Sequence, residues 1–216
     1  MQGFLDLPEF SKIKLSDVEK QLDELLLVAD KKIAELAEIS DPNWDNFIFE
    51  LDDAIDDVQR FFSPVRHLNA VMSSDEIREV YNACLPKLSA WYTELGQNRA
   101  LYERVRKIAD GEVFKSLDSA QRKSIEDQLQ SFELGGVALE GKERDRFKEI
   151  VAELSKLSTR FNENVLDSGN VFRLNFEDAK ALDGFPQSSL DLARQSAEEK
   201  NEKGYSLTLD LSLIHI

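Results

Sequence analysis

The chain has 216 residues, of which 42% are hydrophobic and 32% charged, so it can form a packed core under a well-hydrated surface. Its 42 acidic and 27 basic side chains give a formal net charge of −15 at pH 7. This charge repels phosphate groups and anionic lipid headgroups, so it argues against a nucleic-acid partner and against attachment to a membrane surface. Basic or uncharged partners remain compatible with the composition.

Only 9 glycines and 5 prolines interrupt the chain, which favours long helices. The first residues, MQGFLDLPEF, carry no basic segment followed by a long apolar run, so we expect no signal peptide. No stretch approaches the ~18 consecutive apolar residues of a membrane-spanning helix. The single cysteine, Cys84, cannot form an internal disulfide and fits a reducing compartment. Together these features predict a cytoplasmic protein.

The first helical pattern covers residues 16–38. Ser16 and Glu19 have the spacing of a capping box, in which each side chain accepts a hydrogen bond from a free backbone N–H. The segment SDPNW then interrupts the pattern, with Asp41 as the candidate cap and Pro42 at the first position of the next helix. That helix presents an apolar face at helical spacing, made of Phe47, Leu51, Ala54, Ile55, Val58 and Phe62.

Four acidic residues lie between these apolar positions, namely Asp52, Asp53, Asp56 and Asp57. Clustered carboxylates can bind Ca²⁺, but this spacing lacks the alternating ligands, the central glycine and the closing glutamate of an EF-hand loop. We therefore interpret the four carboxylates as a solvated helix face.

The stretch FFSPVRHLN, residues 61–69, contains one of only two histidines in the chain. Ser63 is a good N-cap and Pro64 suits a first helical turn, so we expect the acidic helix to end or kink near Phe62. His67 would then hydrogen-bond across a helix junction as a neutral imidazole. An independent enzyme centred on His67 is the weaker hypothesis, because no partner motif accompanies this residue.

The next helix is predicted to run from Ser73 to Leu95. Ser73 and Glu76 form a second possible capping box, and Pro86 inside the helix should kink it. Cys84 lies at an apolar position of this helix with no histidine near it in the sequence. We therefore expect a small buried side chain there and not a nucleophile.

Two further helices follow, one ending at Asp110–Gly111 and one covering residues 119–134. The second helix should end at the glycine pair 135–136. A long helix is predicted over residues 142–167, and its apolar face consists of Phe147, Ile150, Val151, Leu154, Leu157, Phe161 and Val165.

The apolar period then changes from helical to alternating. Residues 171–176 and 205–211 place every second apolar side chain on one face, so they predict two strands, whose direct pairing stays open. A helix between them should end at Gly204. The predicted fold class is therefore mainly α, an antiparallel array of six or seven Pro-kinked helices with a small two-strand element near the C-terminus. No repeat, linker or change in composition marks a domain boundary.

No motif of a catalytic, cofactor or metal site occurs in the sequence. H-E-x-x-H is absent, and His67, His215 and Cys84 are too few for a typical structural zinc site. The glycine pair 135–136 lacks the lysine and the spacing of a phosphate-binding loop, and no G-x-S-x-G is present. We therefore assign no catalytic, cofactor-binding or metal-ligating residue.

Six segments nevertheless occur in the order and spacing of one family. They are LPEFSKIK (7–14), SPVRHLNAV (63–71), LPKLSAWYTELGQN (85–98), FELGGVAL (132–139), FNENVLD (161–167) and GYSLTLD (204–210). Through them the chain resembles the N-terminal part of the thimet oligopeptidase/neurolysin family of zinc metallo-oligopeptidases, and within that family its oligopeptidase A branch. The resemblance covers essentially residues 5–210, and SPVxHLNxV and F-x-x-NVLD are its more specific segments.

The resemblance implies a mainly helical fold of two lobes beside a deep channel, which admits short peptides and excludes folded proteins. It also implies that zinc is bound by the two histidines of H-E-x-x-H and a later glutamate, while the glutamate of the motif activates the zinc-bound water. These residues belong to the C-terminal half of family chains and have no counterpart here. We therefore expect no zinc on this chain, whose partners would be that catalytic half and, in the whole enzyme, short peptides.

Two departures from the family pattern stand out. Leu15 stands where the family usually has proline, which should change only the start of a helix. After TLD the family continues with a proline-containing segment, whereas this chain has LSLIHI (211–216). We interpret this tail as a frameshift, a read into non-coding sequence or an expression artefact, so His215 is not expected to be a ligand.

Residues 1–210 are thus predicted to be the N-terminal helical region of an oligopeptidase A-like metallopeptidase, incomplete and inactive alone. This region would act as a scaffold and channel wall, and apolar side chains that face the catalytic half would stay exposed. The alternative is a free-standing acidic helical module that binds a protein partner and exposes no large apolar patch.

Overall fold

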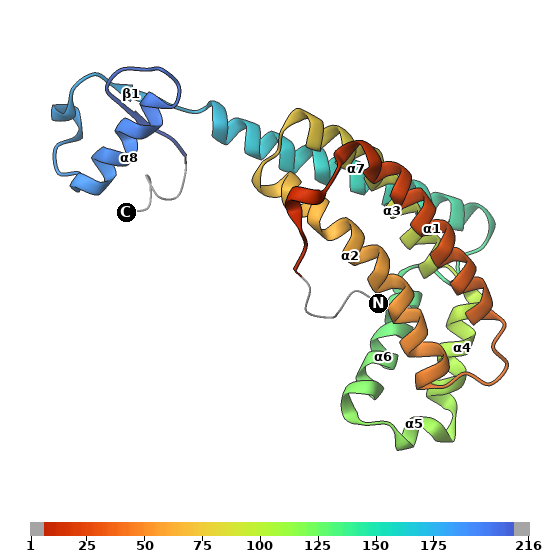
Figure 1. Ribbon diagram of the computed structural model, residues 1–216. Coiled ribbons are helices and arrows are strands. Elements are labelled where there is room, and N and C mark those ends of the chain that lie inside the picture. Colours follow the sequence, from red (N-terminus) through yellow and green to blue (C-terminus); the bar gives the residue numbers. More distant parts are fainter. Residues whose placement is uncertain (1–6, 210–216) are drawn as a thin grey trace. The chain divides into compact units, whose positions relative to one another are not determined.

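The computed structural model describes residues 7–209 (Figure 1). Within them lie eight α-helices and two β-strands, so the prediction of a mainly helical fold with a small strand pair near the C-terminus is confirmed. The chain forms two compact units, one up to Ser155 and one from Lys156 onward. The interpretation of the tail 211–216, including His215, falls outside the described residues.

The first unit begins with three long consecutive helices, each of which runs antiparallel to the one before it (Figure 1). They are α1 (Leu15–Ala37), α2 (Phe49–Val71) and α3 (Asp75–Gly96), and Figure 1 shows them side by side. α1 contacts both α2 and α3, and α2 contacts α3. Each helix buries apolar residues at the predicted spacing, because contact between the three apolar faces removes them from water.

Three shorter helices and the start of a long one complete the first unit. α4 (Arg99–Asp110) and α6 (Ser119–Leu134) pack against each other, and they also contact α1 and α3, respectively. Between them lies α5 (Glu112–Ser116), a five-residue helix that the apolar pattern does not predict. α7 (Gly141–Val171) begins in the first unit and continues beyond Ser155.

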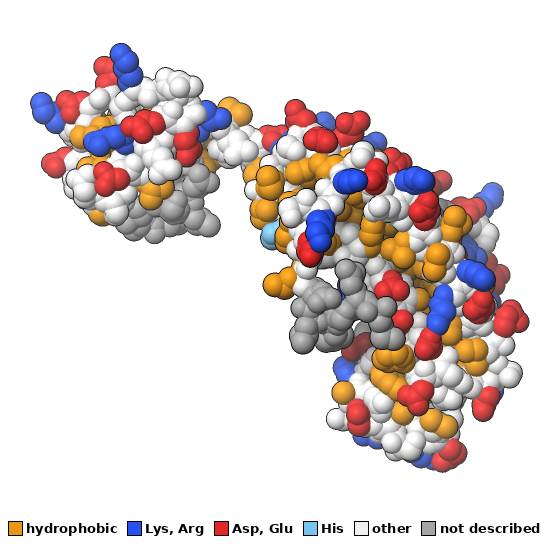
Figure 2. Space-filling model, viewed as in Figure 1, with side chains coloured by type: hydrophobic (Ala, Val, Ile, Leu, Met, Phe, Trp, Pro, Cys, Tyr) orange, Lys and Arg blue, Asp and Glu red, His pale blue; other side chains and the backbone are white. Residues whose placement is uncertain are grey.

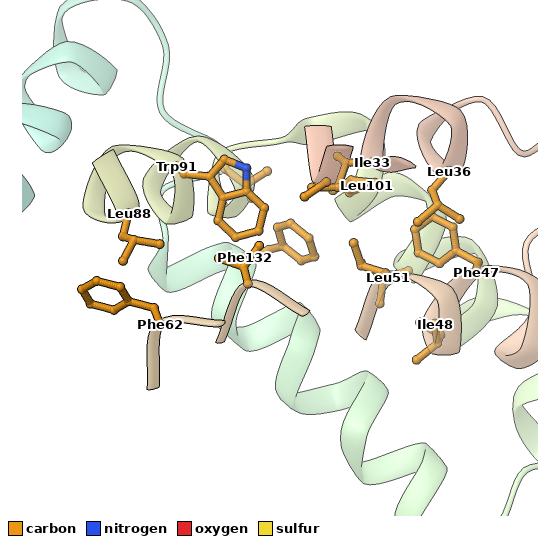
Figure 3. Packing of buried hydrophobic residues seen from close by; sticks show 14 of the residues in the cluster. Ile33, Leu36, Phe47, Ile48, Leu51, Phe62, Leu88, Trp91, Leu101 and Phe132 are labelled. Carbon is orange, nitrogen blue, oxygen red and sulfur yellow. The ribbon is translucent and has the colours of Figure 1, made fainter. Parts of the chain in front are cut away.

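One hydrophobic core joins α1, α2, α3, α4 and α6, and Figure 3 shows side chains from several of these helices pointing into the same space. Leu22, Phe47, Leu101 and Ile125 are completely buried, although they lie far apart in the sequence. Burying one such side chain stabilises a fold by ~1.5–3 kcal/mol, whereas a surface ion pair contributes ~0–1 kcal/mol. The core, and not the many surface charges, therefore holds this unit together.

Two polar contacts join α3 to α1 at the edge of this core. The indole Nε1 of Trp91 donates a hydrogen bond to Asp30 Oδ1 at 2.7 Å, so the ring is buried with its N–H satisfied. Lys87 Nζ lies 2.7 Å from Asp23 Oδ1 and 2.9 Å from Glu19 Oε1, and its hydrogen bonds to these carboxylates raise the lysine pKa. Because the three charged groups are partly exposed, they fix how the helices align more than they stabilise the fold.

The predicted capping box at Ser16 is wrong. α1 begins at Leu15, so Ser16 lies inside the first turn, where its hydroxyl donates to Asp17 Oδ1 at 2.9 Å. Leu15 itself occupies the first helical position, which proline also tolerates because no helical partner is needed for its N–H. The substitution of proline by leucine is therefore compatible with the same helix start.

The predicted cap at Asp41 is also wrong, because Asn43 caps the second helical segment. Asn43 Oδ1 accepts hydrogen bonds from two backbone N–H groups of the next turn at 3.0 Å, and Asn46 Oδ1 accepts from the Asn43 N–H at 2.8 Å. This capping box opens a π-helical turn, Trp44–Ile48, that leads directly into α2. Pro42 consequently precedes the helix, and the pattern alone cannot distinguish two cap residues that serve equally well.

The second predicted capping box is displaced by one residue. Ser73 has a φ of 34°, so it occupies the left-handed position that follows the end of α2 and cannot start a helix. Ser74 is the N-cap of α3, and its Oγ accepts a hydrogen bond from the Ile77 N–H at 3.3 Å. Ser73 Oγ accepts instead from Arg78 Nε at 2.7 Å.

The expected end of the acidic helix near Phe62 does not occur. α2 continues through Pro64 to Val71, and α3 likewise continues through Pro86. Ser63 is therefore an exposed residue inside a helix and not a cap. The apolar stripe provides the reason, since it extends past the proline to Val65, which is 2% exposed, and its burial offsets the hydrogen bond that proline removes.

The ends of α3 and α6 meet at two glycines. A Cβ on Gly135 would lie 3.2 Å from Gly96 O and 3.0 Å from Ser131 O, so the two backbones approach more closely there than a side chain normally permits. α6 ends in a Schellman motif, in which Val137 N donates to Phe132 O at 3.1 Å and Gly136, with a φ of 83°, supplies the left-handed residue. The predicted stop at residues 135–136 is thus confirmed.

This contact predicts unequal effects for two substitutions at one junction. Gly135→Ala should destabilise the protein by ~1–3 kcal/mol, because its methyl group meets backbone oxygens that cannot move independently. Gly96→Ala is the matched control, since its methyl group would lie 3.7 Å from the nearest atom, at ordinary contact distance. Urea denaturation followed by circular dichroism compares them, and equal loss for both variants would contradict this description of the junction.

Beyond the C-terminal part of α7, the second unit contains the strand pair and the helix α8. β1 (Leu174–Phe176) pairs antiparallel with β2 (Tyr205–Leu207), with Leu174 opposite Leu207, which answers the question that the sequence leaves open. α8 (Gln187–Glu198) packs against β2. Its contact face consists of small buried residues, including Ala193 and Ala197, so the helix can lie close to the strand.

Arg173 connects the strands to α8 from inside this unit. Its Nη1 donates to Ser196 O at 3.1 Å and to Ser206 Oγ at 3.2 Å. Ser206 is fully buried, so this hydrogen bond satisfies a hydroxyl that has no access to water. Replacing the arginine would leave that hydroxyl without this partner.

Gly204 allows the chain to turn into β2. It has a φ of 90°, and a Cβ at this position would lie 2.1 Å from Phe176 O. Gly184→Ala provides a matched control, because Gly184 has a φ of 93° but nothing within 4 Å of its Cβ position. Both substitutions carry the ~1–2 kcal/mol cost of a left-handed alanine, and only Gly204→Ala adds the clash.

We therefore expect Gly204→Ala to accelerate amide hydrogen exchange in β1 and β2 far more than Gly184→Ala does. Exchange measured by mass spectrometry over residues 174–207 tests this expectation. Similar exchange in the two variants would show that the left-handed conformation, and not the close approach to Phe176, is what requires glycine.

Candidate functional site

His67 lies on the exposed side of α2 and not at a helix junction. The predicted hydrogen bond across a junction is therefore wrong. Its ring lies 5.4 Å from the ring of Phe10, centroid to centroid, at an interplanar angle of 46°. Phe10 begins a short 3₁₀ turn, Phe10–Lys12, in the segment before α1. His67 thus contacts this lead-in segment, and the two stretches of sequence that share the contact are both among the family-like segments.

Cys84 is completely buried in α3, as predicted. The pKa of its thiol is raised to about 11, mainly by burial and also by the nearby carboxylate of Glu19, while Lys87 acts in the opposite direction. A thiol with this pKa is almost entirely protonated at neutral pH, so it is a poor nucleophile and a poor metal ligand. The structure assigns Cys84 to the core.

The acidic face of α2 makes ordinary contacts with its neighbours. Asp52 Oδ1 accepts a hydrogen bond from Gln128 Nε2 of α6 at 3.0 Å, and partial burial raises the Asp52 pKa. Asp56 forms an ion pair with Arg60 one turn later. Across residues 7–209, no three His, Cys, Asp or Glu side chains gather in a group that could hold a metal ion.

A cleft of about 630 Å³ lies between α2 and α3, with Ser155 of α7 at its edge. Six apolar or aromatic and seven polar side chains line it, and the rings of Phe62 and Tyr81 stack there at 5.6 Å. Arg66 and Tyr92 contribute polar groups, and burial raises the Tyr92 pKa while Arg66 lowers it. A cleft lined by both apolar and polar groups suits a small amphipathic ligand.

The long helix α7 exposes the apolar face that its sequence predicts. None of its residues is buried. Five of the seven predicted apolar positions are between 42% and 67% exposed, and we call them the α7 apolar stripe: Ile150, Leu154, Leu157, Phe161 and Val165. A helix in a monomeric protein normally turns such a face toward a core, so this exposure indicates an interaction surface. The period of 3.6 residues identifies the stripe in the sequence, but only the structure shows that it is uncovered.

Charged groups are interspersed over the face shown in Figure 2, where acidic and basic side chains alternate with hydrophobic ones. No continuous basic patch occurs on that face of residues 7–209, as expected from the net charge of −15. Within the same residues, every helix is too short or too polar to cross a membrane.

Comparison with known proteins decides the family. Residues 22–144 match the family model for the neurolysin/thimet oligopeptidase N-terminal domain, which is more than half of the chain. The chain belongs to the neurolysin/thimet oligopeptidase family. The matched range runs from α1 to the first turn of α7, so the family domain corresponds to the helices that share the hydrophobic core.

Relatives in this neurolysin/thimet oligopeptidase family extend the match along nearly the whole chain. It is 38% identical to "Oligopeptidase A" of Haemophilus influenzae over 205 residues and 37% identical to "Oligopeptidase A" of Escherichia coli over 210 residues. It is also 30% identical to "Probable cytosolic oligopeptidase A" of Arabidopsis thaliana over 203 residues. These alignments cover 94–95% of this chain but only 29–30% of the relatives, so the chain spans less than a third of their length.

Two of the segments that resemble the neurolysin/thimet oligopeptidase family meet at the α3–α6 junction. Gln97 follows Gly96 and is 3% exposed, and its Oε1 accepts a hydrogen bond from Arg144 Nε at 3.0 Å. Lys148 Nζ lies 3.2 Å from Glu94 Oε1, one turn further along α7. The junction therefore attaches the first turns of α7 to the end of α3, which explains the physical role of ELGQN and ELGGV.

The buried state of Cys84 predicts its reactivity. At pH 8 its thiolate fraction should be on the order of 10²-fold below that of an exposed thiol with a pKa near 8.5. Reaction with a soluble aromatic disulfide should therefore be slow, rise about tenfold per pH unit between pH 7 and 9.5, and become fast in 6 M urea. Ala152→Cys in a Cys84→Ala background is the exposed control, and a native Cys84 rate that levels off below pH 9 would contradict the raised pKa.

Proposed function

We propose that this chain acts as the N-terminal scaffold of a zinc-dependent endopeptidase that hydrolyses short peptides, and that it forms part of the wall of the peptide channel. The observation that carries this proposal is the match to oligopeptidase A proteins over 95% of the chain and only 30% of their length. In this arrangement the residues that perform catalysis belong to the larger remainder of such a protein. The scaffold would form the channel wall that holds short peptides and excludes folded proteins, and its residues would take no part in the hydrolysis.

The described residues do not fit a zinc site. A catalytic zinc needs three protein ligands from histidine, cysteine or carboxylate side chains, and residues 7–209 bring no such three together. Cys84 is protonated and buried, and His67 lies beside Phe10. The proposal therefore places the metal outside these residues and derives no catalytic step from them.

The acidic, helical surface supports the remaining parts of the proposal. A net charge of −15 disfavours nucleic acid and anionic membranes as partners, so short peptides and the catalytic remainder of an oligopeptidase A-like enzyme are the proposed partners. We also propose a cytoplasmic location, which the printed name of one relative, "Probable cytosolic oligopeptidase A", supports.

The competing hypothesis, a free-standing acidic interaction module, requires a surface without a large apolar patch. The α7 apolar stripe counts against it, since Leu154, Phe161 and Val165 are each more than half exposed. Binding of the dye ANS and concentration-dependent elution in size-exclusion chromatography distinguish the two, because only a scaffold that lacks its partner surface should show both.

The function is tested with the chain alone and with a chimera. In the chimera, this chain replaces the matched N-terminal 30% of Escherichia coli oligopeptidase A. We expect no hydrolysis of a fluorogenic peptide by the chain alone with added Zn²⁺, and chelator-sensitive hydrolysis by the chimera. His67→Ala in the chimera should leave the rate unchanged within about twofold, which tests the hypothesis of an enzyme centred on His67.

Two results would reject the proposal. One is chelator-sensitive turnover by the chain alone. The other is a chimera that melts cooperatively, and is therefore folded, but hydrolyses no peptide.

A further inference from the structure

We propose that the α7 apolar stripe is a docking surface for a helix from the catalytic remainder of an oligopeptidase A-like protein. This inference rests on the proposed function and adds to it the surface through which the scaffold is joined to the rest. The stripe consists of Ile150, Leu154, Leu157, Phe161 and Val165, each between 42% and 67% exposed.

α7 is attached to α3 through its polar side, and its apolar side is exposed. The side attached to α3 is polar, since Arg144 donates to Gln97 Oε1 at 3.0 Å and Lys148 pairs with Glu94 at 3.2 Å. At 3.6 residues per turn, the stripe lies about a third of a turn away from those contacts. An amphipathic helix that attaches through its polar side and leaves its apolar side in water is stable only if something else covers the apolar side.

The spacing of the stripe identifies the kind of partner. Phe147, which is half-buried, and four residues of the stripe follow one another at intervals of three, four, three and four residues; the four are Ile150, Leu154, Leu157 and Phe161. This is the a/d pattern of a helix that packs lengthwise against another helix with side chains interlocked. A loop or a sheet edge would not require apolar side chains to recur along more than three turns of one helix.

The charges beside the stripe indicate which charged side chains the partner helix should carry. Arg146, Glu153 and Arg160 recur every seven residues along one edge, all exposed, while Val151, Ser158 and Val165 along the other edge carry no charge. A complementary helix would present an apolar seam, with carboxylates facing the two arginines and a basic group facing Glu153. The length that the relatives carry beyond the match, about 70% of their chains, supplies room for such a helix.

The test uses two single cysteines on opposite sides of α7. Phe161→Cys reports on the stripe, and Ala152→Cys, also exposed, lies on the other side of the helix. Both are introduced into the isolated chain and into the Escherichia coli oligopeptidase A chimera. The rate of maleimide modification is then read at the peptide level by mass spectrometry, so that other cysteines do not interfere.

We expect modification of Phe161→Cys to be at least tenfold slower in the chimera than in the isolated chain, and modification of Ala152→Cys to be equally fast in both. Equal rates for Phe161→Cys, or equal protection of both cysteines, would overturn the inference. Protection of Phe161→Cys that appears in the isolated chain as its concentration rises, but is absent in the chimera, would assign the stripe to a second copy and would also overturn the inference.

The outcomes separate this inference from the proposed function. A chimera that hydrolyses peptides but leaves Phe161→Cys reactive rejects the docking surface and keeps the function. A folded chimera that protects Phe161→Cys but hydrolyses no peptide rejects the function and keeps the docking surface. As a second variant, Leu157→Glu should lower the chimera's melting temperature by several degrees, whereas Ala152→Glu should leave it unchanged within about 1 °C, because only Leu157 belongs to the buried seam.

Discussion

The close approach of two backbones at Gly96 and Gly135 holds the first turns of α7 at the end of α3. Because neither residue has a side chain, the ends of α3 and α6 touch directly, and Gln97 becomes buried beside them. Gln97 then accepts the hydrogen bond from Arg144 that fixes the first turns of α7. The polar anchor at this junction thus explains why the apolar side of α7 is the one left free.

Helix spans and buried faces were predictable, because the 3.6-residue period of apolar side chains records burial directly. Helix ends were less predictable. Asp41, Asn43, Ser73 and Ser74 are all good caps by composition, and the choice among neighbours depends on the backbone conformation that the preceding segment imposes. The expected helix end beside Pro64 was wrong for a related reason. Proline is tolerated inside a helix when the tertiary burial of its neighbours outweighs one lost hydrogen bond.

The candidate site was predictable mainly by exclusion. A single cysteine and two histidines by themselves limit the chemistry that the chain can perform, and the raised pKa of Cys84 follows from its apolar position in α3. The contact of His67 with Phe10 was not predictable, because it joins residues more than fifty positions apart. The exposure of the α7 apolar stripe could not be predicted either. An apolar period indicates that a helix face will be buried, but it does not identify the partner that buries it.

The division of the chain into two units has an optical consequence. Both tryptophans, Trp44 and Trp91, belong to the first unit, whereas the strand pair contains Tyr205 and no tryptophan. Intrinsic tryptophan emission therefore follows the unfolding of the helical core alone and is blind to the melting of β1, β2 and α8. Tyr205, whose hydroxyl accepts a hydrogen bond from Arg194 at 2.8 Å, is the one tyrosine of the smaller unit, and the other three belong to the first unit, so only a signal specific to Tyr205 follows the smaller unit separately.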